Sequence, residues 1–130
     1  MNVFAYGTLM FPEVWRRIVG QERSGKKARV EGFALYRVQN AVFPGMIHEA
    51  GAEVWGVVFE DIDEETLFEL DAYESDFYKR EVVEAVAADG RTYDCEAFIV
   101  PQSHRAALTE QPWDAESFEK NDLQAYLDGH

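Results

Sequence analysis

The sequence predicts an α+β domain in which a curved, mostly antiparallel β-sheet or small barrel carries a few packed helices. The chain has 130 residues, which suits a single domain over residues 1–130. Short apolar runs rich in β-branched and aromatic residues recur between turn signals, as expected of about six or seven strands. These runs follow one another too closely for repeated βαβ crossovers, which argues against a doubly wound parallel sheet.

The first elements are a strand over residues 2–6, which ends at Gly7, and a short helix. The helix is predicted from Pro12 to Val19. Proline suits a first helical position, where its missing N–H would have no partner anyway, and Gly20 suits the C-terminal stop.

Three further strands are predicted over residues 28–38, 42–48 and 52–59. They carry the β-branched and aromatic residues typical of strands. Pro44 and Gly45 interrupt the second of these strands, and this pair predicts a bulge or a bend there.

A second helix is predicted to begin at Asp63 and to run to about Tyr73. The Asp63 side chain can cap the free N–H groups of the first turn, and the two glutamates that follow favour the positive end of the helix dipole. Ile62 and Leu67 have the spacing of a hydrophobic staple.

The last third predicts a hairpin and a terminal helix. Strands over residues 78–87 and 91–100 flank Asp89-Gly90, a strong hairpin turn signal. Residues 113–127 are predicted to be helical. Three apolar side chains of this segment are expected to pack it onto the body of the domain: Phe118, Leu123 and Tyr126.

Composition excludes several classes of function. The chain has 12 lysines and arginines against 25 acidic residues, a formal charge of −13, which repels nucleic acids and anionic lipids. No apolar run approaches the roughly 20 residues that span a bilayer, and residues 1–5 lack a basic leader. The single cysteine, Cys95, excludes an intrachain disulfide, and strand alternation predicts it to be a buried structural thiol. We therefore expect a cytoplasmic protein with no membrane, nucleic-acid or obligate protein partner.

Glu74 is the most informative residue. On the second helix, Leu67, Leu70 and Glu74 stand at positions i, i+3 and i+7, so the glutamate shares the inward face with two leucines. Burial of an unpaired carboxylate is costly and raises its pKa toward the range useful for proton transfer. Glu74 is therefore a candidate catalytic group. The alternatives are a buried structural ion pair and a C-terminal turn that returns the side chain to water.

Tyr6-Gly7-Thr8-Leu9 is the second candidate segment. A glycine directly after a strand lets backbone N–H groups point into a cleft, where they can bind a carboxylate or a developing oxyanion. The alternative is a simple turn that ends the strand. The segment lacks the spacing and the lysine of a phosphate-binding Walker loop.

Tyr78 and Arg80 form the third candidate. Alternation along the strand puts them on one face with Val82 and Val86, which predicts that they point inward. An inward arginine needs a carboxylate partner, which Glu74 or Asp71 could supply, and a purely structural ion pair is the alternative.

The histidines argue against other chemistries. His48, His104 and His130 are far apart and have no zinc-ligand spacing, and no GxSxG segment accompanies them. His48 is expected at the surface near a strand end, and His130 is the terminus. We expect no metal and no cofactor.

Five segments, taken in order, resemble one known family: residues 3–9 (VFAYGTL), 43–45 (FPG), 54–59 (VWGVVF) and 70–80 (LDAYESDFYKR), and the pair Trp113 and Phe118. They are similar to the γ-glutamylcyclotransferase, or AIG2-like, proteins, and the match covers nearly the whole chain. The resemblance implies a small mixed β-barrel with packed helices. It also implies cyclisation of a small-molecule γ-glutamyl substrate to 5-oxoproline, with release of an amine or amino acid.

The resemblance also implies roles for the candidate residues. Glu74 corresponds to the family's catalytic glutamate and would be the general acid/base. The amides of Gly7, Thr8 and Leu9 would hold the substrate carboxylate or the oxyanion. Residues that would line the pocket or support Glu74 are Tyr6, Tyr78 and Arg80. The leaving group stays open, and the alternatives to an enzyme are a binding or regulatory module and a structural interaction protein.

Overall fold

A computed structural model describes residues 1–21 and 23–129 of the chain, so the terminal His130 lies outside it. Twelve elements follow one another: β1 (Val3–Ala5), η1 (Thr8–Met10), α1 (Pro12–Val19), β2 (Lys26–Val38), β3 (Pro44–Phe59), α2 (Glu64–Glu74), β4 (Lys79–Ala87), β5 (Thr92–Ile99), η2 (Gln102–Ala107), β6 (Leu108–Pro112), α3 (Ala115–Asn121) and α4 (Leu123–Asp128). Both η elements are 3₁₀ helices.

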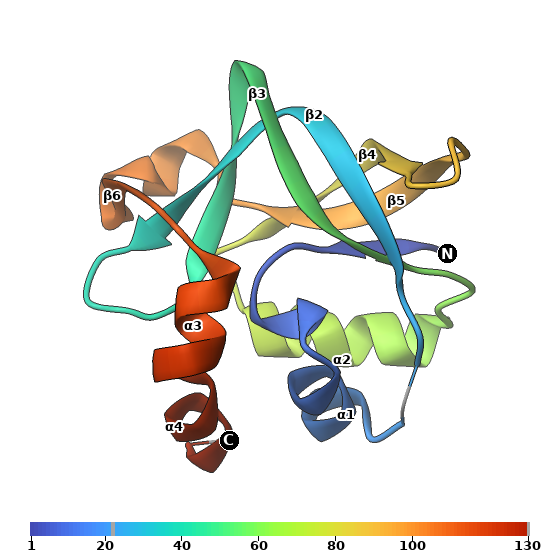
Figure 1. Cartoon of the computed structure of the whole chain (residues 1–130), viewed down its shortest axis with the longest axis horizontal. Coiled ribbons are helices and arrows are strands. Elements are labelled where there is room, and N and C mark those ends of the chain that lie inside the picture. Colours follow the sequence, from blue (N-terminus) through green and yellow to red (C-terminus); the bar gives the residue numbers. More distant parts are fainter. Residues whose placement is uncertain (22, 130) are drawn as a thin grey trace.

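The first five strands close into a mixed barrel. Antiparallel pairs join β1 to β3, β3 to β2, β2 to β4 and β4 to β5, and parallel pairing of β5 with β1 closes the ring. β6 adds to β2 outside the ring. Figure 1 shows α1, α2, α3 and α4 gathered on one side of the barrel. This arrangement confirms the predicted α+β fold class.

Two apolar clusters meet at β1, the strand that leads into the candidate loop. Phe4 and Tyr6 belong to the cluster inside the barrel, whereas Val3 and Ala5 belong to the cluster between the barrel and the helices. Because side chains alternate along a strand, these residues contribute to both clusters, and all four are buried. Both clusters therefore hold the start of the loop in place.

The second helix forms as predicted. The Asp63 side chain accepts a hydrogen bond of 2.7 Å from the Thr66 amide, and Ile62 and Leu67 are both buried. The chain leaves α2 through Ser75, whose φ of +64° starts a sharp turn toward β4. The predicted helix over residues 12–19 and the hairpin at Asp89-Gly90 are also confirmed.

Two predictions about the middle strands are wrong. The segments predicted over residues 42–48 and 52–59 are not separate strands: one long strand, β3, runs from Pro44 to Phe59 and passes through Gly51 at a φ of +84°. Pro44 and Gly45 pair in regular register with Arg37 and Tyr36. The register shifts farther along, where residues 31 and 33 of β2 pair with residues 53 and 48 of β3. Pro44 is tolerated because it is the first residue of the strand, where a missing N–H matters least.

The C-terminal segment also differs from the prediction. It consists of two short helices that meet at Asp122, where the φ of −124° is not helical. Asp114 caps α3 by accepting hydrogen bonds from the amides of Glu116 and Ser117. Phe118 packs onto the body of the domain as predicted. Its side chain is buried, and its ring centroid lies 5.7 Å from that of Tyr126.

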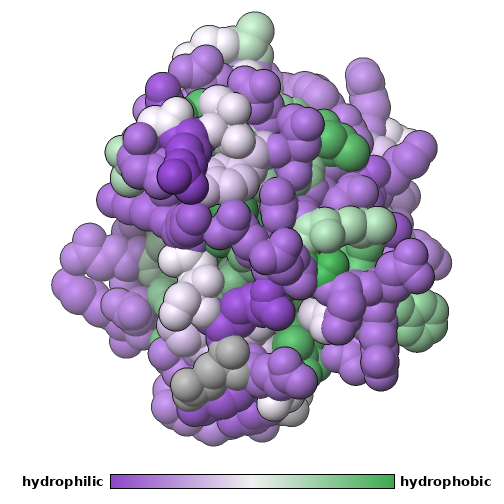
Figure 2. All heavy atoms as spheres, turned by 90° about the vertical axis from the view of Figure 1, so that its right-hand side faces the viewer, coloured by the Kyte–Doolittle hydropathy of each residue, from purple (hydrophilic) through white to green (hydrophobic). Residues whose placement is uncertain are grey.

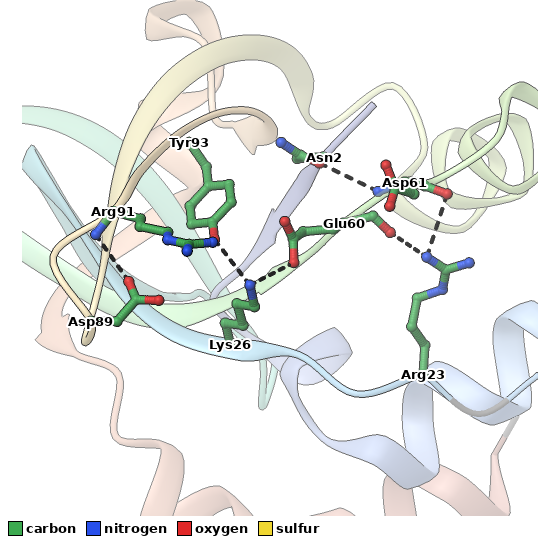
Figure 3. A network of polar contacts seen from close by, with 8 residues as sticks. All are labelled: Asn2, Arg23, Lys26, Glu60, Asp61, Asp89, Arg91 and Tyr93. Atoms are coloured by element: carbon green, nitrogen blue, oxygen red, sulfur yellow. Dashed lines mark hydrogen bonds and ion pairs between the residues drawn. The ribbon is translucent and has the colours of Figure 1, made fainter.

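A polar network on the barrel surface ties the start of β2 to the end of β3 (Figure 3). Lys26 lies 3.0 Å from the Tyr93 hydroxyl and 2.9 Å from the Glu60 carboxylate. Arg23 donates hydrogen bonds to the carbonyls of Glu60 and Asp61. These contacts are exposed, so each adds little to the stability of the fold.

The face shown in Figure 2 is covered mainly by hydrophilic side chains, with hydrophobic atoms scattered among them. Among residues 1–21 and 23–129, four large apolar residues are exposed: Met1, Trp55, Phe68 and Val82. No helix in the described part of the chain combines the length and the apolar composition that a membrane span requires.

Candidate functional site

A cavity of about 300 Å³ lies where β1, the loop that follows it, the end of α2 and α4 come together. Its walls include six of the seven residues proposed from the sequence, namely Tyr6, Gly7, Thr8, Leu9, Glu74 and Tyr78. These residues come from segments about 65 positions apart in the chain. A filled barrel end would have favoured a structural interaction protein, so this cavity counts against that alternative.

Glu74 is the last residue of α2 and its side chain is partly buried. The spacing that predicted an inward glutamate holds, because Leu67 and Leu70 on the same face are both buried. Burial raises the pKa of Glu74 to about 8. No hydrogen-bond or ion-pair partner is found for its carboxylate among residues 1–21 and 23–129, so the buried-ion-pair alternative has no support there.

Tyr6 and Tyr78 flank this carboxylate, and each is fixed by a hydrogen bond to a backbone carbonyl. The Tyr6 hydroxyl donates to Phe98 at 2.6 Å, and the Tyr78 hydroxyl donates to Pro44 at 2.7 Å. Burial raises the pKa of both phenols, and the nearby charge of Glu74 raises each of them further. Both tyrosines therefore stay neutral and act as rigid walls around the glutamate.

The loop after β1 passes close to the start of β3. A Cβ atom on Gly7 would lie 2.9 Å from Cγ of Pro44, so only glycine fits this approach without displacing the proline. Thr8 then begins η1, and the amides in the first turn of a 3₁₀ helix have no acceptor within the helix. The loop can therefore present amides of Gly7, Thr8 and Leu9 to an anionic group.

The structure corrects the placement of Arg80. Its side chain does not line the cavity, because the buried face of β4 carries Val83 and Ala85, while Val82, on the Arg80 face, is 68% exposed. Arg80 instead lies 2.9 Å from Asp71, one of the two partners expected for it, on the outer surface. Period-two alternation defines two faces of a strand but not which of them points inward.

Two tyrosines of the cavity lining were not proposed as site residues from the sequence. Tyr73 and Tyr126 both line the cavity, and their hydroxyls are hydrogen-bonded to each other. The Tyr73 hydroxyl also lies 2.8 Å from Oγ1 of Thr8. In the sequence these residues have only the pattern of core aromatics on helices, and no spacing rule links positions so far apart.

The other titratable candidates lie away from this site. His48 is exposed as expected, but it stands within β3 rather than at a strand end, and it contacts Glu81 at 3.0 Å. Cys95 is 1% exposed, which confirms the predicted buried thiol, and burial raises its pKa to about 12. Neither residue lines the cavity that holds Glu74.

Comparison with known proteins finds relatives among the AIG2-like proteins and the γ-glutamylcyclotransferases. AIG2-like protein C of Arabidopsis thaliana is 25% identical over 127 residues, which cover 97% of this chain and 73% of that protein. A protein of Methanocaldococcus jannaschii, named γ-glutamylcyclotransferase and putative RNase, is 31% identical over 100 residues. That match covers 75% of this chain and 45% of the archaeal protein, so the chain spans about half the length of this relative.

Solved structures show the same fold. A solution structure of an Arabidopsis thaliana protein has a TM-score of 0.76 at 21% identity and covers 98% of this chain and 78% of that one. A structure described as a γ-glutamyl cyclotransferase has a TM-score of 0.70 at 19% identity. The match covers 99% of this chain and 85% of that chain. The family model for γ-glutamyl cyclotransferase, AIG2-like proteins matches residues 3–115. The chain therefore belongs to the γ-glutamyl cyclotransferase, AIG2-like family.

Proposed function

We propose that the protein cyclises a γ-glutamyl group to 5-oxoproline and releases an amine or amino acid. One observation carries this proposal: a partly buried carboxyl, Glu74, with a pKa raised to about 8, lines the cavity without a partner among the described residues. A group with this pKa can both accept and return a proton near neutral pH. A protein that only binds a ligand or a partner has no need of such a carboxyl.

In this reaction the nucleophile belongs to the substrate. The α-amino nitrogen attacks the γ-carbonyl carbon and forms the five-membered ring, and the bond from that carbon to the leaving nitrogen breaks. Glu74 takes a proton from the α-ammonium group and later delivers it to the leaving nitrogen. Two protons leave the α-nitrogen in total, and both end on the amine, which departs as an ammonium ion.

The remaining cavity residues hold the substrate in the bent shape that ring closure requires. The amides of Gly7, Thr8 and Leu9, in the loop that lines the cavity, bind the α-carboxylate or the oxyanion that forms on the γ-carbonyl oxygen. Tyr6 and Tyr78, fixed by their hydrogen bonds, limit the space beside Glu74. Holding both reacting atoms in contact lowers the entropic part of the barrier.

The cavity favours a leaving group without a negative charge. Glu74 must be a carboxylate when it accepts the substrate's proton, and the lining of the cavity includes aromatic rings, among them Phe43 and Phe77. Aromatic faces accept apolar and cationic groups but repel anions. The loop amides are occupied by the substrate's own α-carboxylate, so a second carboxylate has no favourable place.

We therefore expect γ-glutamyl-L-alaninamide to have a kcat/KM about tenfold above that of γ-glutamyl-L-alanine. The two compounds differ only at the C-terminus of the leaving group, where the first has a neutral amide and the second has a carboxylate. A second charge about 6 Å from Glu74 costs about 1.4 kcal/mol at an effective dielectric constant near 40. Initial rates measured over a range of substrate concentrations give the ratio, and a preference for the carboxylate would contradict this choice of leaving group.

Release of 5-oxoproline tests the proposed function itself. Purified protein is incubated with γ-glutamyl-L-alaninamide, γ-glutamyl-L-alanine and γ-glutamyl-ethylamine, and both products are quantified. One molecule of 5-oxoproline for each amine, well above the spontaneous rate, supports the proposal. Folded protein that releases none from any substrate contradicts it and favours a binding module that retains the cavity.

A further inference from the structure

A chain of three hydroxyl groups connects the C-terminal helix to the loop after β1. The Tyr126 hydroxyl, from α4, is hydrogen-bonded to the Tyr73 hydroxyl, at the end of α2. The Tyr73 hydroxyl lies 2.8 Å from Oγ1 of Thr8, the first residue of η1. All three residues line the cavity that holds Glu74. We call Tyr126, Tyr73 and Thr8 the hydroxyl chain.

The chemistry of these groups favours one direction for the hydrogen bonds. A phenol, with a pKa of about 10, is a stronger donor than the aliphatic hydroxyl of threonine. These acidities favour the direction in which Tyr73 donates to Thr8 and Tyr126 donates to Tyr73. In that direction the Thr8 hydroxyl accepts from Tyr73 and keeps its own hydrogen for a further bond, and Thr8 lines the cavity. Successive hydrogen bonds in one direction also strengthen each other.

Tyr126 is well placed to hold this arrangement. Its ring packs edge-on against the buried Phe118, with ring centroids 5.7 Å apart. α4 is in turn attached to α1, because Arg17 donates a 2.7 Å hydrogen bond to the carbonyl of Leu127. The family model matches residues 3–115, so Tyr126 lies outside the matched segment.

We propose that Tyr126 is a positioning residue, which acts through Tyr73 to turn the Thr8 hydroxyl toward the α-carboxylate of a γ-glutamyl substrate. This inference rests on the proposed function. The C-terminal helix thereby contributes to substrate binding without contacting the reacting atoms. Because the α-carboxylate is bound equally in the substrate and in the transition state, loss of the chain should change KM rather than kcat.

The test is a double-mutant cycle between Tyr126→Phe and Thr8→Val, with 5-oxoproline release as the assay. Tyr126→Phe keeps the ring that packs on Phe118 and removes only the hydroxyl. We expect its KM for γ-glutamyl-L-alaninamide to rise about fivefold, with kcat within about twofold. In the Thr8→Val background the same change should have no further effect, since coupled residues give non-additive effects. Thr8→Ser, which keeps a hydroxyl, should retain most of the wild-type KM.

Tyr36→Phe is the matched control, because it removes a tyrosine hydroxyl that is bonded to Glu49 outside this cavity. Its KM should stay at the wild-type value. The proposal would be overturned if Tyr126→Phe leaves KM unchanged. It would also be overturned if Tyr126→Phe raises KM by the same factor in the wild type and in Thr8→Val. Neither result would count against the cyclotransferase activity.

A second readout does not depend on turnover. The amide and methyl NMR resonances of Thr8 should move in Tyr126→Phe and stay in place in Tyr36→Phe. Resonances that are identical in Tyr126→Phe and in wild type would overturn the hydroxyl chain even if no substrate is turned over. Absence of 5-oxoproline from the wild type, with shifted Thr8 resonances, would instead count against the proposed function.

Discussion

Glu74→Gln is expected to lower the kcat/KM for 5-oxoproline release by about 10²- to 10⁴-fold, the usual contribution of a general acid or base. Glutamine keeps the shape of the side chain but cannot accept a proton from the substrate ammonium group. The loss should appear mainly in kcat, because the loop amides and the tyrosine walls stay in place. Initial rates with γ-glutamyl-L-alaninamide measure the effect.

Glu69→Gln is the matched control. Glu69 lies on the same helix, but its side chain is exposed and does not line the cavity. Its activity should equal that of the wild type. Equal activity of Glu74→Gln and Glu69→Gln would show that a different group moves the proton.

Glu74→Gln should also change how the free energy of unfolding depends on pH. The pKa of Glu74 is about 8 in the folded protein, against 4.5 for an ordinary glutamate, so the folded state holds a proton that the unfolded state releases between these values. The contribution of this carboxyl is complete below about pH 4.5 and is lost as the pH rises through 8. The free energy of unfolding of the wild type should therefore fall relative to that of Glu74→Gln across this window, as urea denaturation can measure.

Gly56→Ala should destabilise the whole domain by about 3 kcal/mol or more and lower the melting temperature by about 10 °C. A Cβ atom at this position would lie 2.3 Å from the carbonyl oxygen of Ala5 and 2.9 Å from the Phe4 ring. The first of these is a backbone atom of the strand paired with β3, so the strands must separate. Thermal unfolding followed by circular dichroism measures the change.

The separation of β1 from β3 in Gly56→Ala should also disturb the cavity, because β1 leads directly into the loop of Tyr6 to Leu9. Gly51→Ala is the control, since nothing lies within 4 Å of its Cβ position and only its φ of +84° opposes a side chain. That strain costs about 1 kcal/mol. A loss of stability in Gly56→Ala no larger than in Gly51→Ala would mean that β1 and β3 are not packed as described.

The sequence predicted the parts of the site that depend on local rules. The cap at Asp63 fixes where α2 begins, and from there the helical period alone puts Glu74 on the face of Leu67 and Leu70. The residues Tyr6 to Leu9 follow a buried strand, so their place at a strand end could be expected. Both segments were also part of the family resemblance, which brought them together before the fold was known.

Other features depended on information that local patterns do not contain. On β4, valines stand on both faces, so alternation could not decide whether Arg80 or Val83 points inward. The break expected at Pro44 is absent because the first position of a strand tolerates proline, and the register between β2 and β3 shifts instead at residues 49–52 of β3. Tyr73 and Tyr126 meet across 53 positions, and only the docking of the terminal helix brings their hydroxyls together.

The central claim is that Glu74 is a carboxyl that keeps its proton to near neutral pH, and direct titration tests it without any substrate. Side-chain carboxyl ¹³C resonances of uniformly labelled protein are followed from about pH 3 to pH 10, in the wild type and in Glu74→Gln. One glutamate resonance is expected to titrate with an apparent pKa of about 8 and to be missing from the variant. If every glutamate carboxyl instead titrates near its ordinary value, Glu74 is not protonated at neutral pH and the proposed acid/base mechanism is wrong.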